Sequence, residues 1–292
     1  MKYNVGITVF TPTFNRAYIL EKLYKSLLNQ TDKSFEWVIV DDGSTDNTKA
    51  LVDKFIEEKK IDITYVYTEN GGKSAAFNKG VLYAKYNLFF CVDSDDYLSD
   101  NCVESLNKIN LRIKDDKKIV GIIAYRENIA GKNKFVENVK KDYIRLSELY
   151  AKYNYRGETA LAFKTNLLKE NPFPIIKGDK FITESWLYDR LDRIGKSYFL
   201  QKVIYYCQYL DDGYTKNDAE IIRKNVKSFI IFSEQRMDIA IYLKTKLKGA
   251  LYYNVCNIIN KSKIKYIFHK HFLLIVATII PAYIYYLKKF KK

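Results

Sequence analysis

The feature that most constrains the fold is an alternation of short apolar runs with segments of helical periodicity in the first 92 residues. Apolar runs occupy 6–10, 37–40, 63–67 and 88–92, and segments that match amphipathic helices lie between them at 17–30, 45–59 and 74–84. Short buried strands that alternate with amphipathic helices are typical of βαβ units. We therefore expect an α/β fold with a mostly parallel central sheet flanked by helices.

The remaining residues are less regular and end in helices. Their pattern predicts strands at 119–125 and 202–209, a helix from about 101, helices at 146–153 and 181–193, and long helical stretches from about 219 onward. The sequence contains no internal repeat and no low-complexity linker.

Polar side chains follow each of the first four predicted strands. These segments are Thr11–Arg16, Asp41–Asp46, Glu69–Ser74 and Asp93–Asp96. The carboxyl ends of parallel strands meet at one edge of a sheet, where α/β proteins bind their ligands. We therefore expect carboxylates, a glycine-rich turn and cations around one crevice. Neither GxGxxG nor GxxxxGK[ST] occurs, so a dinucleotide fingerprint and a P-loop are not supported.

The small number of histidines excludes two classes of site. His269 and His271 are the two histidines of the chain, so its body can hold neither a histidine zinc site nor a Ser-His-Asp triad. A catalytic metal there must be held by carboxylates, which suit Mg²⁺ or Mn²⁺. The four cysteines lack CxxC spacing and no signal-peptide pattern precedes the first strand, so we expect a cytoplasmic protein.

The basic residues are distributed unevenly. The chain has a formal charge of +15, and residues 239–292 contain eleven lysines and no Asp or Glu. That segment carries +11, which leaves +4 for residues 1–238. Because the body offers no basic stripe interleaved with aromatic residues, we expect no nucleic-acid partner.

The C-terminal segment is also apolar. Phe272–Leu287 is sixteen residues long without a charge, and lysines flank it on both sides. A straight helix of that length reaches about 24 Å, short of the roughly 30 Å hydrocarbon core, and Pro281 should kink it. We expect a membrane-associating tail that lies on anionic lipid at the inner face of the cell membrane. The alternative is a buried C-terminal helix.

The strand-end segments TPTFNR, VDDGSTD, ENGGKSAAFNKG and VDSDD resemble, in order and position, those of the family 2 glycosyltransferases, which are inverting enzymes with the GT-A nucleotide-diphospho-sugar transferase fold. The resemblance covers about residues 5–215. It implies a catalytic domain at 1–215, with a nucleotide-sugar-binding half at about 1–125 and an acceptor half at 126–215, followed by a helical extension at 216–292. It also implies a nucleotide-sugar donor, UDP-linked by default, and a divalent metal.

The resemblance makes Asp93 and Asp95 the DxD pair. It implies that Asp95 ligates the metal directly and that Asp93 faces the ribose and the metal shell. A metal held in this way neutralises the charge that a nucleoside diphosphate gains as the glycosidic bond breaks. The alternative is that Asp93–Asp96 caps the following helix. An EF-hand is excluded because Leu98 stands where that loop requires glycine.

The resemblance also implies the residues that bind the nucleoside. Pro12, Thr13 and Phe14 match the segment that lines it, and Asp42 matches the carboxylate that bonds the nucleobase. Family members often have tyrosine where Phe14 stands, so the ring face remains without the hydroxyl. The alternative is that DDGSTD is a turn with helix-capping residues.

Three residues are implied in binding phosphate. Arg16 is placed to reach a phosphate, Gly72 allows the backbone to approach the donor closely, and Lys73 is a candidate contact of the diphosphate. The alternative for Lys73 is a position in a solvated turn.

An inverting transfer needs a base that removes the proton of the acceptor hydroxyl. The segment TESW lies where the family has an acid near the start of a helix, so we expect Glu184 to be the catalytic base. Trp186 is then either a wall on which a sugar stacks or a core tryptophan. Asp179 and Asp189 are the rival acids.

A cytoplasmic enzyme held on a membrane is well placed to act on a glycan acceptor that is polyprenyl-linked, as in capsule or other cell-surface polysaccharide biosynthesis. Two other functions are alternatives to a glycosyltransferase. A sugar nucleotidyltransferase usually has a glycine-rich loop after its first strand, and Thr11–Arg16 has no glycine. A non-catalytic membrane-bound scaffold is disfavoured by the intact DxD pair and by Glu184.

Overall fold

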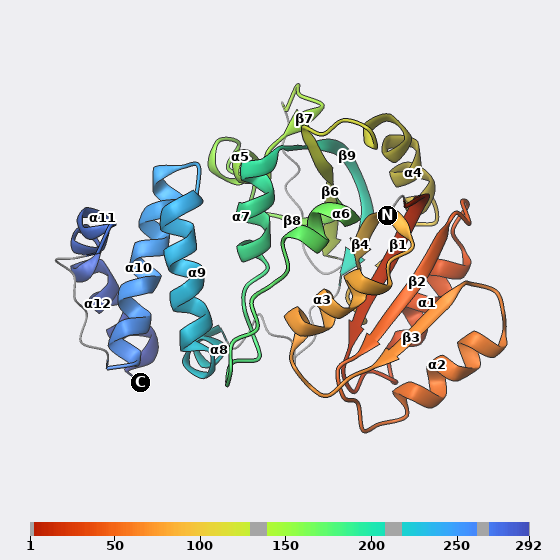
Figure 1. The fold of residues 1–292 in the computed structure, drawn as a ribbon, viewed down its shortest axis with the longest axis horizontal. Coiled ribbons are helices and arrows are strands. Elements are labelled where there is room, and N and C mark those ends of the chain that lie inside the picture. Colours follow the sequence, from red (N-terminus) through yellow and green to blue (C-terminus); the bar gives the residue numbers. More distant parts are fainter. Residues whose placement is uncertain (1–2, 129–138, 208–217, 262–268, 292) are drawn as a thin grey trace. The chain divides into compact units, whose positions relative to one another are not determined.

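The computed structural model describes residues 3–128, 139–207, 218–261 and 269–291. The chain divides into two compact units, residues 1–172 with 194–209, and residues 173–193 with 210–292. The segment 173–193 therefore belongs to the same unit as the C-terminal helices, although the sequence suggests that it is part of the catalytic domain. Figure 1 labels the elements of both units.

A nine-stranded sheet forms the centre of the first unit, with the strand order β3-β2-β1-β4-β8-β6-β9-β5 and with β7 paired to β9. Its first four strands along the chain are β1 (Asn4–Thr13), β2 (Phe35–Asp41), β3 (Ile63–Tyr67) and β4 (Tyr86–Cys91). They run parallel, as the sequence predicts. The register sets Thr13 opposite Asp41, and Asp41 opposite Tyr67, so the carboxyl ends of three strands lie together.

The second half of the sheet is mixed. It contains β5 (Tyr97–Leu98), β6 (Ile119–Asn128), β7 (Tyr143–Ile144), β8 (Glu158–Lys164) and β9 (Lys196–Cys207). β8 runs antiparallel to both β4 and β6, whereas β6 and β9 are parallel. The expected mostly parallel sheet is thus confirmed for the first half alone. The described part of the β6–β8 connection contains β7 and the six-residue helix α5 (Leu146–Ala151), too little for the usual helical crossover between parallel strands.

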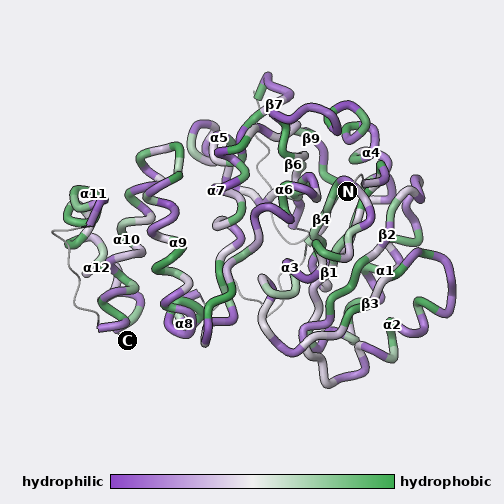
Figure 2. Tube along the Cα trace, viewed as in Figure 1, coloured by the Kyte–Doolittle hydropathy of each residue, from purple (hydrophilic) through white to green (hydrophobic). Residues whose placement is uncertain are grey.

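Helices cover both faces of the parallel strands. On one face α1 (Leu20–Leu28), α2 (Thr48–Glu57) and α4 (Cys102–Ile113) contribute to a core that includes Trp37. On the other face α3 (Lys73–Tyr83) sets Phe77 against Phe10, with ring centroids 5.6 Å apart. A Cβ on Gly80 would lie 2.3 Å from the Phe10 ring, so glycine lets α3 approach the sheet. β2 is buried at every residue and contains the apolar run 37–40, as expected for a strand that is covered on both faces; Figure 2 colours the chain by hydropathy.

The second unit is helical. It contains α7 (Ser185–Ile194), α8 (Asp218–Lys224), α9 (Val226–Ile239), α10 (Leu243–Ile259), α11 (Phe272–Ala277) and α12 (Ile279–Phe290). α12 packs on α10 through Ala282 and Phe290, which share a buried cluster with Val255 and Cys256. α11 packs through Ile275 against Tyr253. The helices predicted from about 219 onward are therefore confirmed.

The apolar tail is interrupted at Thr278 rather than kinked at Pro281. Pro281 lies in the first turn of α12, where its missing N–H has no helical partner to lose. Asn254 of α10 donates hydrogen bonds to the Ile275 carbonyl at 2.8 Å and to the Thr278 hydroxyl at 3.0 Å. A buried side chain thus satisfies the backbone where α11 ends.

One side of α11 and α12 is buried and the other is exposed. Six apolar side chains, which we call the tail stripe, are exposed by 38 to 80%: Phe272, Leu273, Val276, Ile280, Tyr283 and Ile284. The packed side of these helices fits the alternative of a buried C-terminal helix, and the tail stripe does not. Among the helices of the described residues, none is long and apolar enough to cross a membrane.

Candidate active site at the ends of the first four strands

The turns after β1 and β2 are tied together. Asn15 has a φ of 52°, a conformation that asparagine tolerates better than most residues. Its side-chain oxygen accepts hydrogen bonds from the backbone N–H groups of Thr45 at 2.8 Å and Asp46 at 3.3 Å. These contacts fix the loop that carries Phe14, a residue that is 45% exposed.

The two aspartates after β2 have different environments. Asp41 is fully buried and accepts a hydrogen bond from the Tyr65 hydroxyl at 2.6 Å. Burial, together with that bond, raises the pKa of Tyr65. Asp42 lies at the strand end and accepts hydrogen bonds from the backbone N–H groups of Gly71 and Gly72, both at 2.8 Å. Asp41 therefore supports the sheet, whereas Asp42 joins the β2 turn to the glycine turn after β3.

The glycine turn leads directly to Lys73. Gly72 has a φ of 88°, which a residue with a side chain rarely adopts. Lys73 is the first residue of α3, and its Nζ lies 2.6 Å from Oδ1 of Asp93 after β4. The structure thus brings together the ends of β2, β3 and β4, and Lys73 contacts the DxD pair rather than lying alone in a solvated turn.

The two carboxylates of the DxD pair have opposite pKa shifts. Burial opposes ionisation of Asp93, but Lys73 and Arg126 hold its pKa below the ordinary value. Burial and the nearby charge of Asp93 raise the pKa of Asp95. A cation bound near Asp95 would stabilise the ionised form of its carboxyl group and so lower its pKa.

Arg126 of β6 and Tyr205 of β9 also belong to the site, although the sequence analysis missed them. Arg126 Nη2 lies 2.7 Å from Oδ2 of Asp96, and the Tyr205 hydroxyl donates a hydrogen bond of 2.6 Å to the same oxygen. Burial raises the pKa of Asp96 to about 7, against the opposing effect of Arg126. The signal for Arg126 was a charged residue directly after the apolar run at 119–125.

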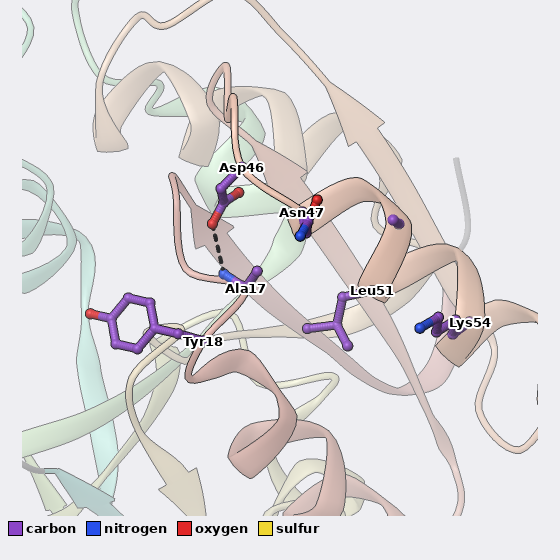
Figure 3. A pocket seen from close by; sticks show the side chains of 7 residues that line it. Ala17, Tyr18, Asp46, Asn47, Leu51 and Lys54 are labelled. Atoms are coloured by element: carbon purple, nitrogen blue, oxygen red, sulfur yellow. Dashed lines mark hydrogen bonds between the residues drawn. The ribbon is translucent and has the colours of Figure 1, made fainter.

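Arg16 remains at the edge of the site. Its guanidinium donates a hydrogen bond to the Tyr18 hydroxyl and lies 5.7 Å from the centroid of that ring. Tyr18 also lines an open groove of about 680 Å³ with Leu51 and Lys54 (Figure 3). None of the predicted site residues lines this groove.

Glu184 and Trp186 belong to the second unit. Glu184 is half-buried directly before α7 and accepts a hydrogen bond from the Tyr188 hydroxyl at 3.1 Å. Trp186 is 5% exposed, and the Arg190 guanidinium lies 4.1 Å from its ring centroid. This buried position fits the core alternative for Trp186.

The rival acids already have structural partners. Asp179 accepts the backbone N–H of Ser228 at 2.7 Å. Asp189 accepts two hydrogen bonds from the Arg236 guanidinium, at 2.7 and 3.2 Å.

The chain is similar to a known protein family. Residues 8–170 match the model of glycosyl transferase family 2. The chain belongs to this family. Over 122 residues this glycosyltransferase is 35% identical to glycosyltransferase GlyA of Streptococcus pneumoniae serotype 4, a match that covers 42% of the chain and 17% of GlyA. Over 271 residues it is 26% identical to the hyaluronan synthase of Pasteurella multocida, covering 90% of the chain and 26% of that protein. The first curated relatives are matched over 17 to 53% of their own length.

Solved structures support the GT-A fold of this glycosyltransferase. Staphylococcus aureus TarS 1–349 in complex with UDP-GlcNAc matches with a TM-score of 0.62 at 19% identity, covering 96% of this chain and 89% of that one. A mannosyltransferase from Pyrobaculum calidifontis in complex with GDP-Man and Mn²⁺ matches with a TM-score of 0.57 at 16% identity, covering 98% and 88%. The family and fold inferred from the strand-end segments are thus confirmed.

The charges around the DxD pair suit a divalent cation. Four carboxylates lie near three cations: Asp93, Asp95, Asp96 and Glu158 with Lys73, Arg126 and Arg16, whose charge acts on Asp95. The acids therefore outnumber the basic groups. Within the described ranges, no group of three or more His, Cys, Asp or Glu residues could hold a metal by itself. This arrangement fits Mg²⁺ or Mn²⁺, which commonly binds one or two carboxylates and completes its shell with substrate phosphates and water.

Proposed function

We propose that this glycosyltransferase moves a sugar from a UDP-linked donor to a hydroxyl group of a lipid-linked glycan, with inversion at the anomeric carbon. The observation that carries the proposal is the convergence of Asp42, Gly72, Lys73 and Asp93 from three strand ends. Support for the donor comes from the likeness to TarS in complex with UDP-GlcNAc and with UDP.

The residues at the strand ends would hold the donor. Asp42 bonds the nucleobase and Phe14 packs on its face, beside Pro12 and Thr13. Lys73, which lies beside Asp93, would contact the diphosphate and add positive charge as the bond to the sugar breaks. Asp95 and Asp93 would hold Mg²⁺ or Mn²⁺, which supplies further positive charge to the leaving group.

Glu184 would act as the base. The acceptor oxygen forms a bond to the anomeric carbon while the bond from that carbon to the diphosphate oxygen breaks. The electron pair leaves with UDP and the hydroxyl proton passes to the Glu184 carboxylate. Support for this assignment is that Asp179 and Asp189 are both engaged in hydrogen bonds that hold the second unit together.

The tail stripe supports a membrane-bound acceptor. Six exposed apolar side chains lie in a segment that contains no acidic residue, with Lys270 before it and Lys288 after it. Apolar side chains flanked by lysines favour binding in the interfacial plane of an anionic membrane. The enzyme would then work at the inner face of the cell membrane in the synthesis of a capsule or another cell-surface polysaccharide.

The test is a panel of labelled nucleotide sugars incubated with the protein, Mn²⁺ and either a polyprenyl-linked or a soluble glycan. Release of UDP with transfer to the lipid-linked glycan is expected. Equal rates on both acceptors would contradict the lipid-linked assignment. Release of pyrophosphate would instead indicate a nucleotidyltransferase, and absence of any turnover across the panel would favour a scaffold.

A further inference from the structure

Arg126 is the centre of a network that spans three neighbouring strands behind the DxD pair. In the register of the sheet, Arg126 on β6 lies opposite Glu158 on β8 and opposite Tyr205 on β9. Asp93 and Asp96 follow β4 and complete what we call the Arg126 network. The pairing of β6 with both neighbours fixes the backbone of three of its five members, so the network is built into the sheet.

The guanidinium of Arg126 lies within ion-pair distance of three carboxylates. Its Nη2 lies 2.7 Å from Asp96 and 3.7 Å from Asp93, and its Nε lies 3.1 Å from Glu158. The guanidinium carbon also lies 4.6 Å from the centroid of the Tyr205 ring. Planar geometry and several donors make arginine suited to such a position, which a lysine ammonium cannot reproduce.

Tyr205 links the network to the backbone of the DxD turn. Its hydroxyl donates a hydrogen bond to Asp96 at 2.6 Å and accepts one from the backbone N–H of Asp93 at 2.9 Å. The side chain of Asp96 is 2% exposed. A buried carboxylate that loses its cation is strongly destabilised, so without Arg126 Asp96 would take up a proton or move toward water, and either change alters the turn.

The three aspartates of the turn differ in their ion pairs. Asp93 pairs with Lys73, and Asp96 pairs with Arg126. Asp95 makes no ion pair with the residues that the structure describes. The network therefore holds Asp93 and Asp96, which flank Asp95 in the turn, while the charges of Arg16 and Arg126 act on Asp95 from a distance.

We infer that Arg126 is a positioning residue for the donor site: through Asp96 and Tyr205 it sets the orientation of the Asp93–Asp96 turn, and thereby the affinity for the cation and diphosphate. This inference rests on the proposed metal-assisted function. Partners that orient metal ligands typically change metal affinity about 10- to 100-fold when they are replaced. Arg126 acts on the turn and not on the transferred sugar, so its replacement should weaken cation binding before any chemistry occurs.

The test measures Mn²⁺ binding at a fixed UDP concentration, from the paramagnetic resonance signal of free Mn²⁺. Arg126→Lys keeps the charge and removes the planar fork, and Tyr205→Phe removes the hydroxyl that joins Asp93 to Asp96. The matched control is Arg236→Lys, because Arg236 forms a comparably buried pair with Asp189 in the second unit. Thermal unfolding of each variant reports whether it is folded.

We expect Arg126→Lys to bind Mn²⁺ with UDP about tenfold or more weakly, Tyr205→Phe to bind a few-fold more weakly, and Arg236→Lys to match the wild type. The double variant Arg126→Lys/Tyr205→Phe should lose less than the product of the two single effects, because both act through Asp96. Unchanged Mn²⁺ affinity in a folded Arg126→Lys would overturn the inference. If Arg126→Lys does not fold, unchanged affinity in Tyr205→Phe overturns it. Failure of the wild type to bind Mn²⁺ with UDP would overturn the proposed metal site, and this inference with it.

Discussion

The two units differ in the side chains that they present at their surfaces. In the first unit, ionised groups at the strand ends are turned toward one another: Asp42 binds two backbone N–H groups, Lys73 pairs with Asp93, and Arg126 pairs with Asp96. In the second unit, the tail stripe exposes apolar side chains between lysines, of which Lys270 pairs with Asp238 and Lys289 with Asp218.

This difference indicates two kinds of surface. Carboxylates held close together and partly buried have high electrostatic energy, which a bound cation or a positively charged ligand lowers. Exposed apolar side chains lose free energy when they leave water, and flanking lysines add attraction to anionic headgroups. On the proposed function, the first unit binds a small charged ligand and the tail stripe of the second unit binds an extended anionic surface. Changes to the tail stripe should therefore leave donor binding in the first unit intact.

The largest effect is expected from Asp95→Asn in the first unit. Loss of the carboxylate removes the proposed direct ligand of the cation, so kcat/KM for UDP-sugar turnover should fall by about 10³-fold or more. Measured binding to anionic vesicles should not change. The control is Asp100→Asn, which changes an exposed acid five residues away. Turnover close to that of Asp100→Asn would show that Asp95 does not hold the cation.

A smaller loss of sugar-transfer activity is expected from Glu184→Gln in the second unit. Removing the base should lower the rate of sugar transfer about 10²- to 10⁴-fold, while Mn²⁺ and UDP bind as in the wild type. The comparison is with Glu220→Gln on α8, a change of an acid that is paired with Lys224 at the surface. A rate near that of the wild type would assign the base to another residue. This variant tests whether the second unit contributes to chemistry as well as to docking.

Membrane docking should depend on the tail stripe. Leu273 and Ile280 are 80% and 73% exposed, and Leu273→Glu with Ile280→Glu places two charges where apolar groups would enter the interface. Binding to phosphatidylglycerol vesicles should fall about tenfold or more, with UDP and Mn²⁺ binding unchanged. Leu111→Glu is the control, because Leu111 is 59% exposed on α4 in the first unit. Equal vesicle binding by the two proteins would remove the distinction between the units.

The smallest effect concerns the pH dependence of stability in the first unit. Burial opposes ionisation of Asp32, but hydrogen bonds from Asn107 and Ser34 hold its pKa below the ordinary value of 3.8. A lowered folded-state pKa stabilises the protein above the unfolded-state pKa, and this stabilisation is lost as the pH falls through the folded-state value.

Asp32→Asn should therefore lower the free energy of unfolding at pH 7 by less than about 1 kcal/mol, because solvent screens a carboxylate that is only partly buried, and the difference from the wild type should shrink below about pH 4. Urea unfolding at a series of pH values measures both. A difference that stays constant down to pH 2 would contradict the assignment to Asp32 ionisation.

Much of the first unit was predictable because its signals are local. The strand predicted at 63–67 has the same bounds in the structure, and the helix predicted at 74–84 begins one residue earlier, at Lys73. The strand-end motifs identified the family because their residues lie close together in the chain. The grouping of Lys73 and Asp93 at one edge followed from the expectation that parallel strands end together, but their ion pair was not predicted.

Other parts could not be read from local patterns. The antiparallel direction of β8 depends on pairing between segments far apart in sequence, with Phe163 opposite Phe89 and Gly121. The interruption of the tail at Thr278 depends on Asn254, which lies 24 residues earlier. Arg126 was missed because its three carboxylate partners lie far from it in sequence: Asp93 and Asp96 in the turn after β4, and Glu158 in β8.

The sequence by itself determined the α/β class, the family, the carboxylates of the DxD pair and the concentration of lysines at residues 239–292. These properties lie in residue type and short spacing, which fix local backbone preference and local charge. The tertiary structure alone decided which acids are paired, which apolar side chains of the tail stay exposed, and that Arg126 joins the DxD turn to the sheet. Such outcomes depend on which distant segments exclude water from one another, because burial sets both the energy of a charge and its need for a partner.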